Sequence, residues 1–266
     1  MQRTYRKKRI RRYEARTPSN AARQAIQDAI QKISDCAEME NWFRNYANHH
    51  QKRLAFDYDT VTGRLEKSAE IVECGAAPFI LTVALVNSGY NVTGLDIDPN
   101  RFKRTIERTK LTILKCDIEN EPLPLADNSV TCVLFNQLFE HLRINIIRTM
   151  REVLRVLKPE GQLVLSTPNL LSASGIINLV KRQTAFSTAK GVFEQYEKLD
   201  SIGHMGHVRE YTSREVCEFL EKTGFSVDEI VYRGSYKNRF RQMVTKMFPS
   251  LRPNFGIVAS KPAVSR

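Results

Sequence analysis

The sequence has no apolar run long enough to cross a lipid bilayer. The stretch from Phe79 to Val86 stops at Asn87, and the stretch from Val153 to Leu165 is interrupted by the polar segment Lys158 to Gln162. Both are shorter than the roughly 18 consecutive apolar residues that a spanning helix needs. The charged N-terminus has no apolar region after it, which disfavours a secretory signal and leaves an Arg-rich organellar presequence open. The simplest expectation is a cytoplasmic protein.

Cysteine is also scarce. The five cysteines are an odd number and include no C-x-x-C pair, which argues against a disulfide framework and against a zinc site. Cys74, Cys116 and Cys132 lie within apolar, strand-like segments. We expect them to be buried as small hydrophobic side chains.

Acidic residues are rare at both ends of the chain, although the formal net charge is +12. Residues 1 to 16 have a net charge of +7 and residues 232 to 252 a net charge of +6, so the rest of the chain sums to −1. Such ends can attract phosphate or an anionic membrane. We predict that residues 1–18 form a basic, disordered tail, because they lack apolar periodicity.

The basic segment 232–252 also has an amphipathic pattern. Tyr236, Phe240, Val244 and Met247 recur at helical spacing, and the cations fall mainly between them. A helix of this kind can lie on an anionic membrane surface, which would place the protein peripherally at a membrane. It can equally pack its apolar side on the rest of the protein, with its charges merely solvated.

Helical and strand-like segments divide the remaining chain. Residues 19–60 have helical apolar spacing and are expected to form a helical extension, and residues 61–266 alternate short apolar runs with helix-length stretches. This order predicts an α/β fold, a Rossmann-like, doubly wound, mixed seven-stranded sheet. Residues 168–210 are expected to be a lid or substrate insertion after the fifth strand. The strands are predicted at Ile71–Cys74, Asn91–Ile97, Thr112–Cys116, Val130–Phe135, Gln162–Thr167, Ser226–Tyr232 and Phe255–Lys261, and the helices at Pro78–Asn87, Asn100–Lys110, Asn145–Leu157 and Thr212–Lys222.

A nucleotide-like ligand is expected where the first two of these strands end. Gly75, Ala76 and Ala77 keep the turn after the first strand narrow, so that backbone can approach a ligand closely. An acid at the end of the second strand can accept hydrogen bonds from both ribose hydroxyls. Asp96 is our choice for this role and Asp98 the alternative, since Asp96 follows Gly75 by 21 residues, close to the roughly 20 expected.

From about Arg53 to Lys261 the chain resembles class I S-adenosylmethionine-dependent methyltransferases. The most specific string is REVLRVLKPEGQLVLSTPN at Arg151 to Asn169, which with EHL at Glu140 to Leu142 is similar to the subgroup that methylates small molecules and saccharides. The resemblance implies S-adenosyl-L-methionine as cofactor and a site that extends to Asn136. Carried over position by position, it assigns the methionine part of the cofactor to Glu73, Gly75 and Ala77, the ribose to Asp96, and the adenine to Ile97, Asp117 and Ile118.

The glycine-rich turn departs from this resemblance at two positions. Ala77 and Phe79 stand where the family usually has glycine, and a left-handed backbone at Phe79 would cost about 1 to 2 kcal/mol. An inactive binding module that keeps the fold is therefore one alternative. A nicotinamide-dependent reductase is disfavoured, because G-x-G-x-x-G is incomplete.

The acceptor of the methyl group is expected to be a hydroxyl of a small molecule or saccharide. His141 follows the fourth strand, and the string GHMGHVREY brings His204 and His207 to the end of the insertion. His141 and His207 are the candidate catalytic bases; no metal site is predicted, because a third ligand is not evident. Methylation of base amines is disfavoured without a Pro-Pro-Tyr type string after the fourth strand. An RNA-associated methyltransferase or RNA-binding protein that uses the basic ends stays open.

Overall fold

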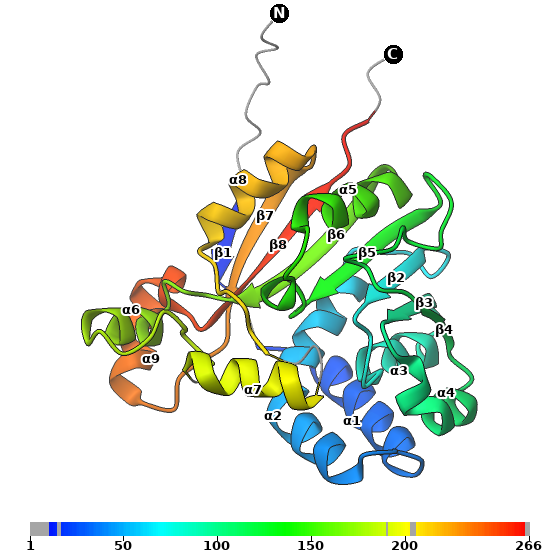
Figure 1. Ribbon diagram of the computed structural model, residues 1–266, viewed down its shortest axis with the longest axis horizontal. Helices are drawn as coiled ribbons and strands as arrows, with labels where there is room; N and C mark the ends of the chain where they lie inside the picture. The colour runs from blue at the N-terminus through cyan, green and yellow to red at the C-terminus, as the bar shows by residue number, and fades with distance from the viewer. Residues whose placement is uncertain (1–10, 15–16, 190, 203–205, 264–266) are drawn as a thin grey trace, which may run out of the picture.

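One mixed β-sheet runs through the molecule (Figure 1). The computed structural model describes residues 11–14, 17–189, 191–202 and 206–263. The strands lie in the order β1-β7-β8-β6-β5-β2-β3-β4, with β8 antiparallel to both of its neighbours. Their bounds are β1 Arg11–Glu14, β2 Glu70–Cys74, β3 Asn91–Asp96, β4 Thr112–Lys115, β5 Val130–Asn136, β6 Leu157–Pro168, β7 Ser226–Arg233 and β8 Asn254–Ser260.

All seven strands predicted from the sequence are confirmed, and β6 begins earlier than predicted, at Leu157. An eighth strand was not predicted. β1 lies inside the segment expected to be a disordered tail, and pairs in parallel with β7. The tail prediction is therefore wrong for Arg11–Glu14, while residues 1–10 and 15–16 lie outside the described part of the chain.

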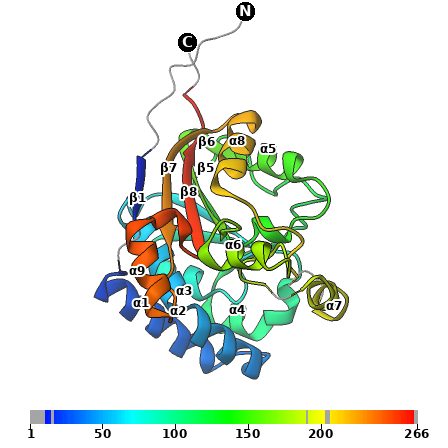
Figure 2. The ribbon, with the colours of Figure 1, turned by 90° about the vertical axis from the view of Figure 1, so that its left-hand side faces the viewer.

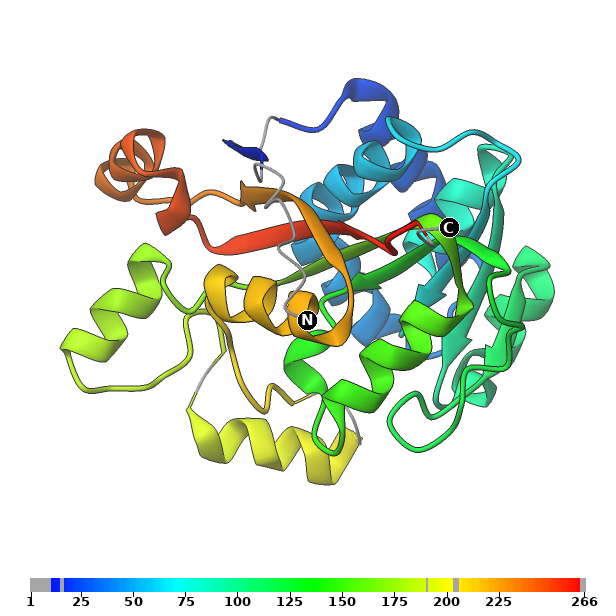
Figure 3. The same cartoon turned by 90° about the horizontal axis from the view of Figure 1, so that it is seen from above.

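Two layers of helices enclose the sheet (Figure 3). Neighbouring side chains of β2 enter different cores: Ile71 belongs to the core that includes residues of α1, α2 and α3, and Val72 to the core that includes residues of α5 and α8. Such alternation is what a sheet buried on both faces requires. The predicted burial of Cys74, Cys116 and Cys132 is confirmed. The helices of the two layers are α1 Asn20–Ser34, α2 Glu40–Thr62, α3 Ile80–Asn87 and α4 Lys103–Thr109 on one side, with α5 Ile146–Val156 and α8 Ser213–Thr223 on the other.

The strand order reverses between β2 and β5. From β2 the chain moves outward through β3 and β4, and then returns to add β5 and β6 on the other side of β2. In open α/β sheets a ligand binds beside such a reversal, at the carboxyl ends of the strands. Two short 3-10 helices shape this edge, η1 Pro99–Phe102 after β3 and η2 Phe139–His141 after β5.

The described part of the long insertion after β6 contains two helices. They are α6 Ala173–Val180 and α7 Val192–Ile202, and α6 lies beside α9 Arg239–Met247 (Figures 1 and 2). A third 3-10 helix, η3 Pro249–Leu251, connects α9 to β8. None of the helices in the described part of the chain is long and apolar enough to cross a membrane.

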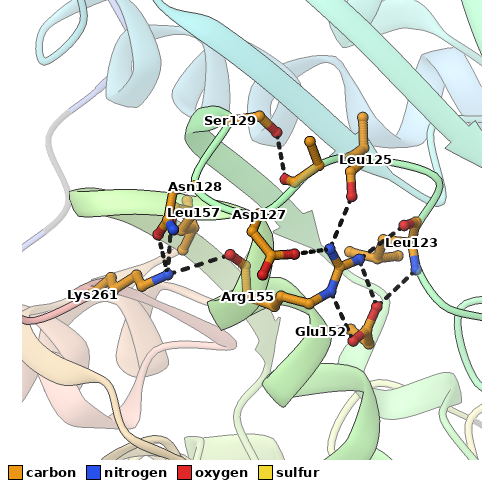
Figure 4. A network of polar contacts seen from close by, with 10 residues as sticks. Leu123, Leu125, Asp127, Asn128, Ser129, Glu152, Arg155, Leu157 and Lys261 are labelled. Atoms are coloured by element: carbon orange, nitrogen blue, oxygen red, sulfur yellow. Dashed lines mark hydrogen bonds and ion pairs between the residues drawn. The ribbon is translucent and has the colours of Figure 1, made fainter.

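Arg155 on α5 fixes the loop between β4 and β5 (Figure 4). Its guanidinium donates to the carbonyls of Leu123 and Leu125 at 3.0 and 2.9 Å, and to the carboxylates of Asp127 and Glu152. Hydrogen bonds to charged groups are among the stronger ones in proteins. The arginine therefore holds in place the loop whose first residues, Asp117 and Ile118, face the site described next.

Candidate cofactor and acceptor site

A cavity of about 490 Å³ opens at the strand reversal. Residues that follow β2, β3, β4 and β5 line one part of it, α2 forms another wall, and η2 with the end of the insertion forms the remainder. Seven of the eight predicted cofactor residues line this cavity, namely Gly75, Ala77, Asp96, Ile97, Asp117, Ile118 and Asn136. The eighth, Glu73, faces a small adjoining hollow instead.

The turn after β2 is narrow because it packs against Leu138 and is bonded to β3. Gly75 has φ 63°, and a Cβ added to it would approach the Leu138 side chain to 3.0 Å. The N–H of Ala76 donates to the carbonyl of Leu95 at 3.1 Å, which ties the turn to β3. Glycine is needed at this position, because a side chain would be strained in φ and crowded in space.

Phe79 adopts the left-handed backbone conformation at φ 67°, the conformation that the missing glycine would favour. Its side chain is fully buried and packs edge-on against Phe102, with ring centroids 5.5 Å apart. It is not among the residues that line the cavity. Burial of a phenyl ring offsets a backbone cost of about 1 to 2 kcal/mol, so the departure from glycine leaves the cavity open.

Asp96 ends β3 with its side chain at the cavity, and Asp98 is not among the lining residues. The pKa of Asp96 is raised, because burial outweighs the lowering effects of hydrogen bonds from the backbone amides of Asp98 and Ala77 and of the charge of Arg101. The amide of Asp98 donates to Asp96 Oδ1 at 2.9 Å. A carboxylate fixed in this way can accept hydrogen bonds from a ribose diol.

Glu73 lies beneath the turn. Its carboxyl group accepts a hydrogen bond from the hydroxyl of Thr82 on α3. Burial raises the pKa of Glu73 to about 8, against the smaller lowering effect of the Thr82 hydrogen bond. The side chain is therefore protonated at neutral pH and braces the turn against α3.

The wall contributed by α2 was missed in the sequence analysis. Trp42, Tyr46, His50 and Arg53 line the cavity, although they belong to the segment predicted as an extension before the domain. Their spacing places them along one side of a helix. The sequence analysis used this spacing to predict a helix, but not to predict that the helix borders the site. Arg53 donates to the hydroxyl of Tyr46 at 2.8 Å, and its Nε is buried with no protein partner.

The two predicted bases, His141 and His207, come together at the other end of the cavity. Their rings meet edge-on with centroids 4.8 Å apart. His141 Nδ1 lies 2.9 Å from the carbonyl of Gly206, and His207 Nδ1 lies 3.3 Å from Glu210 Oε1. Because these oxygens only accept, both Nδ1 atoms donate, and in a neutral ring this leaves Nε2 as the acceptor. His204 lies outside the described residues.

Burial and hydrogen bonding set the protonation states of His141 and Glu210. Burial, followed by the nearby His207, lowers the pKa of His141 to about 4, so that it is neutral at physiological pH. Burial alone would raise the pKa of Glu210, but hydrogen bonds from His207, Ser187 and Thr188 outweigh it and lower that pKa to about 2. Glu210 is thus a fixed carboxylate that orients the His207 ring.

Glu140 is the third group at this end, and sequence reasoning did not select it. Its Oε2 accepts from Thr167 Oγ1 at 2.9 Å, and its Oε1 is buried without a partner. One ligand atom from each of Glu140, His141 and His207 lies within 4.8 Å of the others. Zinc–nitrogen bonds are about 2.0 to 2.1 Å long, so a shared metal ion would require these side chains to move closer together.

Comparison with known proteins agrees with this geometry. Residues 72–165 match the family described as a methyltransferase domain. A Mycolicibacterium smegmatis protein with the name "Probable S-adenosylmethionine-dependent methyltransferase" is 28% identical over 216 residues, which cover 80% of this chain and 70% of that protein.

Solved structures share the fold at low sequence identity. A SAM-dependent methyltransferase from Methanosarcina mazei has a TM-score of 0.55 at 16% identity, covering 77% of this chain and 97% of that one. One from Aquifex aeolicus has a TM-score of 0.51 at 18% identity, covering 77% and 89%. The [4+2]-cyclase SpnF has a TM-score of 0.55 at 13% identity, covering 93% and 99%.

The sheet, its strand reversal and the cavity define an α/β enzyme that binds a nucleoside-type cofactor. It contains a methyltransferase domain at residues 72–165, and it is similar to S-adenosylmethionine-dependent methyltransferases. Its cofactor is S-adenosyl-L-methionine, which supplies an activated methyl group on a sulfonium.

The lining residues fit this cofactor. Asn136 Nδ2 and Arg53 Nε are buried donors without protein partners, and both residues face the cavity. Buried donors of this kind are normally satisfied, and a cofactor carboxylate would satisfy them. Asp96 would hold the ribose, Ile97 and Ile118 would flank the adenine, and Asp117 would accept from its amine.

Proposed function

We propose that this enzyme transfers the methyl group of S-adenosylmethionine to a hydroxyl group of a small molecule or saccharide. The observation that carries the proposal is the His207–Glu210 pair at the cavity, in which a carboxylate fixes the ring so that Nε2 of the neutral form is an acceptor. A base positioned in this way can take the proton of an acceptor hydroxyl. Transfer then needs little more than alignment and the exclusion of water.

The neighbours of His207 favour an acceptor with several hydroxyls. Glu140 Oε1 has no partner, and the neutral His141 presents its own Nε2 as a further acceptor. Polar atoms of Glu140, His141 and His207 lie within 4.8 Å of one another, and burial raises the pKa of Glu140, which favours a carboxyl group that can donate as well as accept. Such a cluster is matched by neighbouring hydroxyl groups, as on a sugar ring, because each hydroxyl can donate and accept. A buried polar atom without a partner costs about 1 to 3 kcal/mol, so binding such a substrate is favourable at this end.

The experiment compares His207→Ala, Glu210→Gln and the unchanged enzyme. A cell extract is incubated with each protein and an isotopically labelled methyl donor, and mass spectrometry identifies the labelled product. We expect His207→Ala to lower kcat about 10²-fold or more, with unchanged S-adenosylmethionine affinity and partial rescue by added imidazole. Glu210→Gln should lower kcat less, because the base stays while its orientation is weakened.

Three outcomes would contradict the proposal. Label on RNA would overturn the assignment of a small-molecule or saccharide acceptor, and label on a nitrogen atom of the product would overturn the assignment of a hydroxyl acceptor. Full activity of His207→Ala would remove the base from the reaction. Stoichiometric metal in the purified enzyme, with activity lost to a chelator and restored by the metal, would show that Glu140, His141 and His207 are ligands instead.

A further inference from the structure

Helix α9 exposes its apolar residues and buries a polar one, the reverse of an ordinary surface helix. Phe240, Met243 and Met247 share one side and are 68%, 53% and 69% exposed. The buried residue of the helix is Thr245, whose hydroxyl donates to the carbonyl of Arg241 at 2.9 Å. A surface helix normally buries its apolar stripe and exposes its polar side. Of the two alternatives for this segment, packing on the protein through the apolar side therefore does not hold for Phe240 and Met247.

The neighbouring helix α6 shows the same inversion. Its buried residue is Gly175, where an added Cβ would lie 1.9 Å from the carbonyl oxygen of Leu170. Leu179 and Val180, in contrast, are 43% and 76% exposed. Close backbone packing at Gly175 fixes α6 in this orientation, so its apolar residues cannot simply turn inward.

Hydrogen bonds join the two helices into one unit. The amide of Ser174 donates to the hydroxyl of Tyr236 at 3.2 Å, and Arg241 donates to Ser174 Oγ at 3.1 Å. At the base, Asn169 Nδ2 donates to the carbonyls of Ser250 and Arg252, at 2.8 Å each. Figures 1 and 2 show α6 and α9 together on one side of the molecule.

The charge around these helices has one sign. Residues 169–193 and 230–261 contain no Asp or Glu. Lys181 and Arg182 follow α6, while Lys237, Arg239 and Lys246 lie on or beside α9, and all five are exposed. Two copies of such a face would repel each other, and nucleic acid would leave the apolar side chains in water. An anionic lipid surface satisfies both the charge and the apolar residues.

We propose that α6 and α9, with Phe240, Met243, Met247, Leu179 and Val180 as the inserting side chains, form a docking surface for an anionic lipid bilayer. The apolar side chains enter the boundary between headgroups and acyl chains, and the lysines and arginines contact lipid phosphates. Each cation near such a surface contributes about 1 kcal/mol, roughly a fivefold change in binding.

The test is sedimentation with vesicles of phosphatidylglycerol and phosphatidylcholine, compared with vesicles of phosphatidylcholine alone. We expect binding to the anionic vesicles that weakens with added salt. Phe240→Ser should weaken it about tenfold, because a buried aromatic side chain is lost. Lys237→Glu combined with Arg239→Glu should weaken it further and flatten the salt dependence.

The matched control is Phe193→Ser on α7. Phe193 is 76% exposed, but Glu194 and Glu197 lie beside it in the sequence. This variant should bind vesicles like the unchanged protein. Equal binding by Phe240→Ser and the unchanged protein would overturn the proposal and assign the affinity to other basic residues, such as 1–16. Failure to bind, or a stable dimer that Phe240→Ser dissociates, would overturn it as well.

Discussion

Buried carboxyl groups with different partners surround the cavity. Glu73 is protonated at neutral pH under the turn, whereas Asp96 receives two backbone amides that favour its charged form. Glu210 is held ionised by several donors. The same chemical group therefore serves as a neutral brace, a candidate ribose acceptor and a fixed charge beside a histidine. Burial and hydrogen bonding, rather than residue type, separate these roles.

The pKa of Glu73 leads to a pH-dependent contribution to stability. Its folded-state pKa is about 8, raised from 4.5 by burial, so its contribution is fully present below pH 4.5 and is lost as the pH rises to about 8. Glu73→Gln keeps an acceptor for Thr82 but cannot ionise.

We therefore expect the free energy of unfolding of the unchanged protein to fall relative to that of Glu73→Gln across this pH window. The slope is at most ~1.4 kcal/mol per pH unit. Urea unfolding at several pH values measures it. A constant difference between the two proteins would contradict the assigned pKa.

Site residues were predictable from the sequence where the local backbone, a strand end or a tight turn, determines their position. Gly75 and Asp96 are set by a strand end and a turn, and both face the cavity. Arg53 and Glu140 were not predicted, because their importance depends on which buried atoms lack partners after tertiary packing. The spacing of one segment cannot reveal that.

Helix α2 is part of the site and not an extension, and ion pairs fix it to the sheet. Asp57 pairs with Arg233 of β7, with 1% and 6% of their side chains exposed, and Arg64 pairs with Glu229 of the same strand. The Arg233 guanidinium also lies over the ring of Phe56, 5.3 Å from its centroid. These contacts set the position of the wall that carries Tyr46 and Arg53.

Asp57→Asn should therefore destabilise the protein by about 3 to 5 kcal/mol, since it leaves a buried arginine without its counter-charge. It should also weaken S-adenosylmethionine binding, because α2 loses its anchor. Chemical unfolding and calorimetry measure the two effects. Arg214→Gln, which breaks an exposed pair with Glu218, is the control and should change neither. Unchanged stability of Asp57→Asn would show that the pair does not hold α2.

Strands were predictable because seven of them alternate or run continuously apolar and are bounded by turns. β1 was not, since Arg11–Glu14 has little apolar character and no alternating pattern, and it pairs in parallel with β7. The reach of α2 into the site was missed for a related reason. Helical periodicity shows which side of a helix is apolar, but not which part of that side borders a cavity.

Across the protein as a whole, most of the net positive charge lies in residues 1–16 and 232–252, outside the segments that line the cavity. The chain between residues 17 and 231 is nearly neutral, and exposed cations lie on or beside α9. The insertion links the docking surface to the site, because it contains α6 at one end and His207 at the other. A membrane contact through α6 and α9 would thus hold the acceptor end of the enzyme near the bilayer.

Calorimetric titration with S-adenosylmethionine tests the site most directly. The unchanged protein should bind one equivalent, and Asp96→Ala should bind about tenfold more weakly or worse, since hydrogen bonds to a charged carboxylate are lost. Asp98→Ala, a change two residues away and outside the cavity lining, should bind normally. Circular dichroism should show that all three are folded. Equal affinity of Asp96→Ala and the unchanged protein, or no binding at all, would contradict the cavity as the cofactor site.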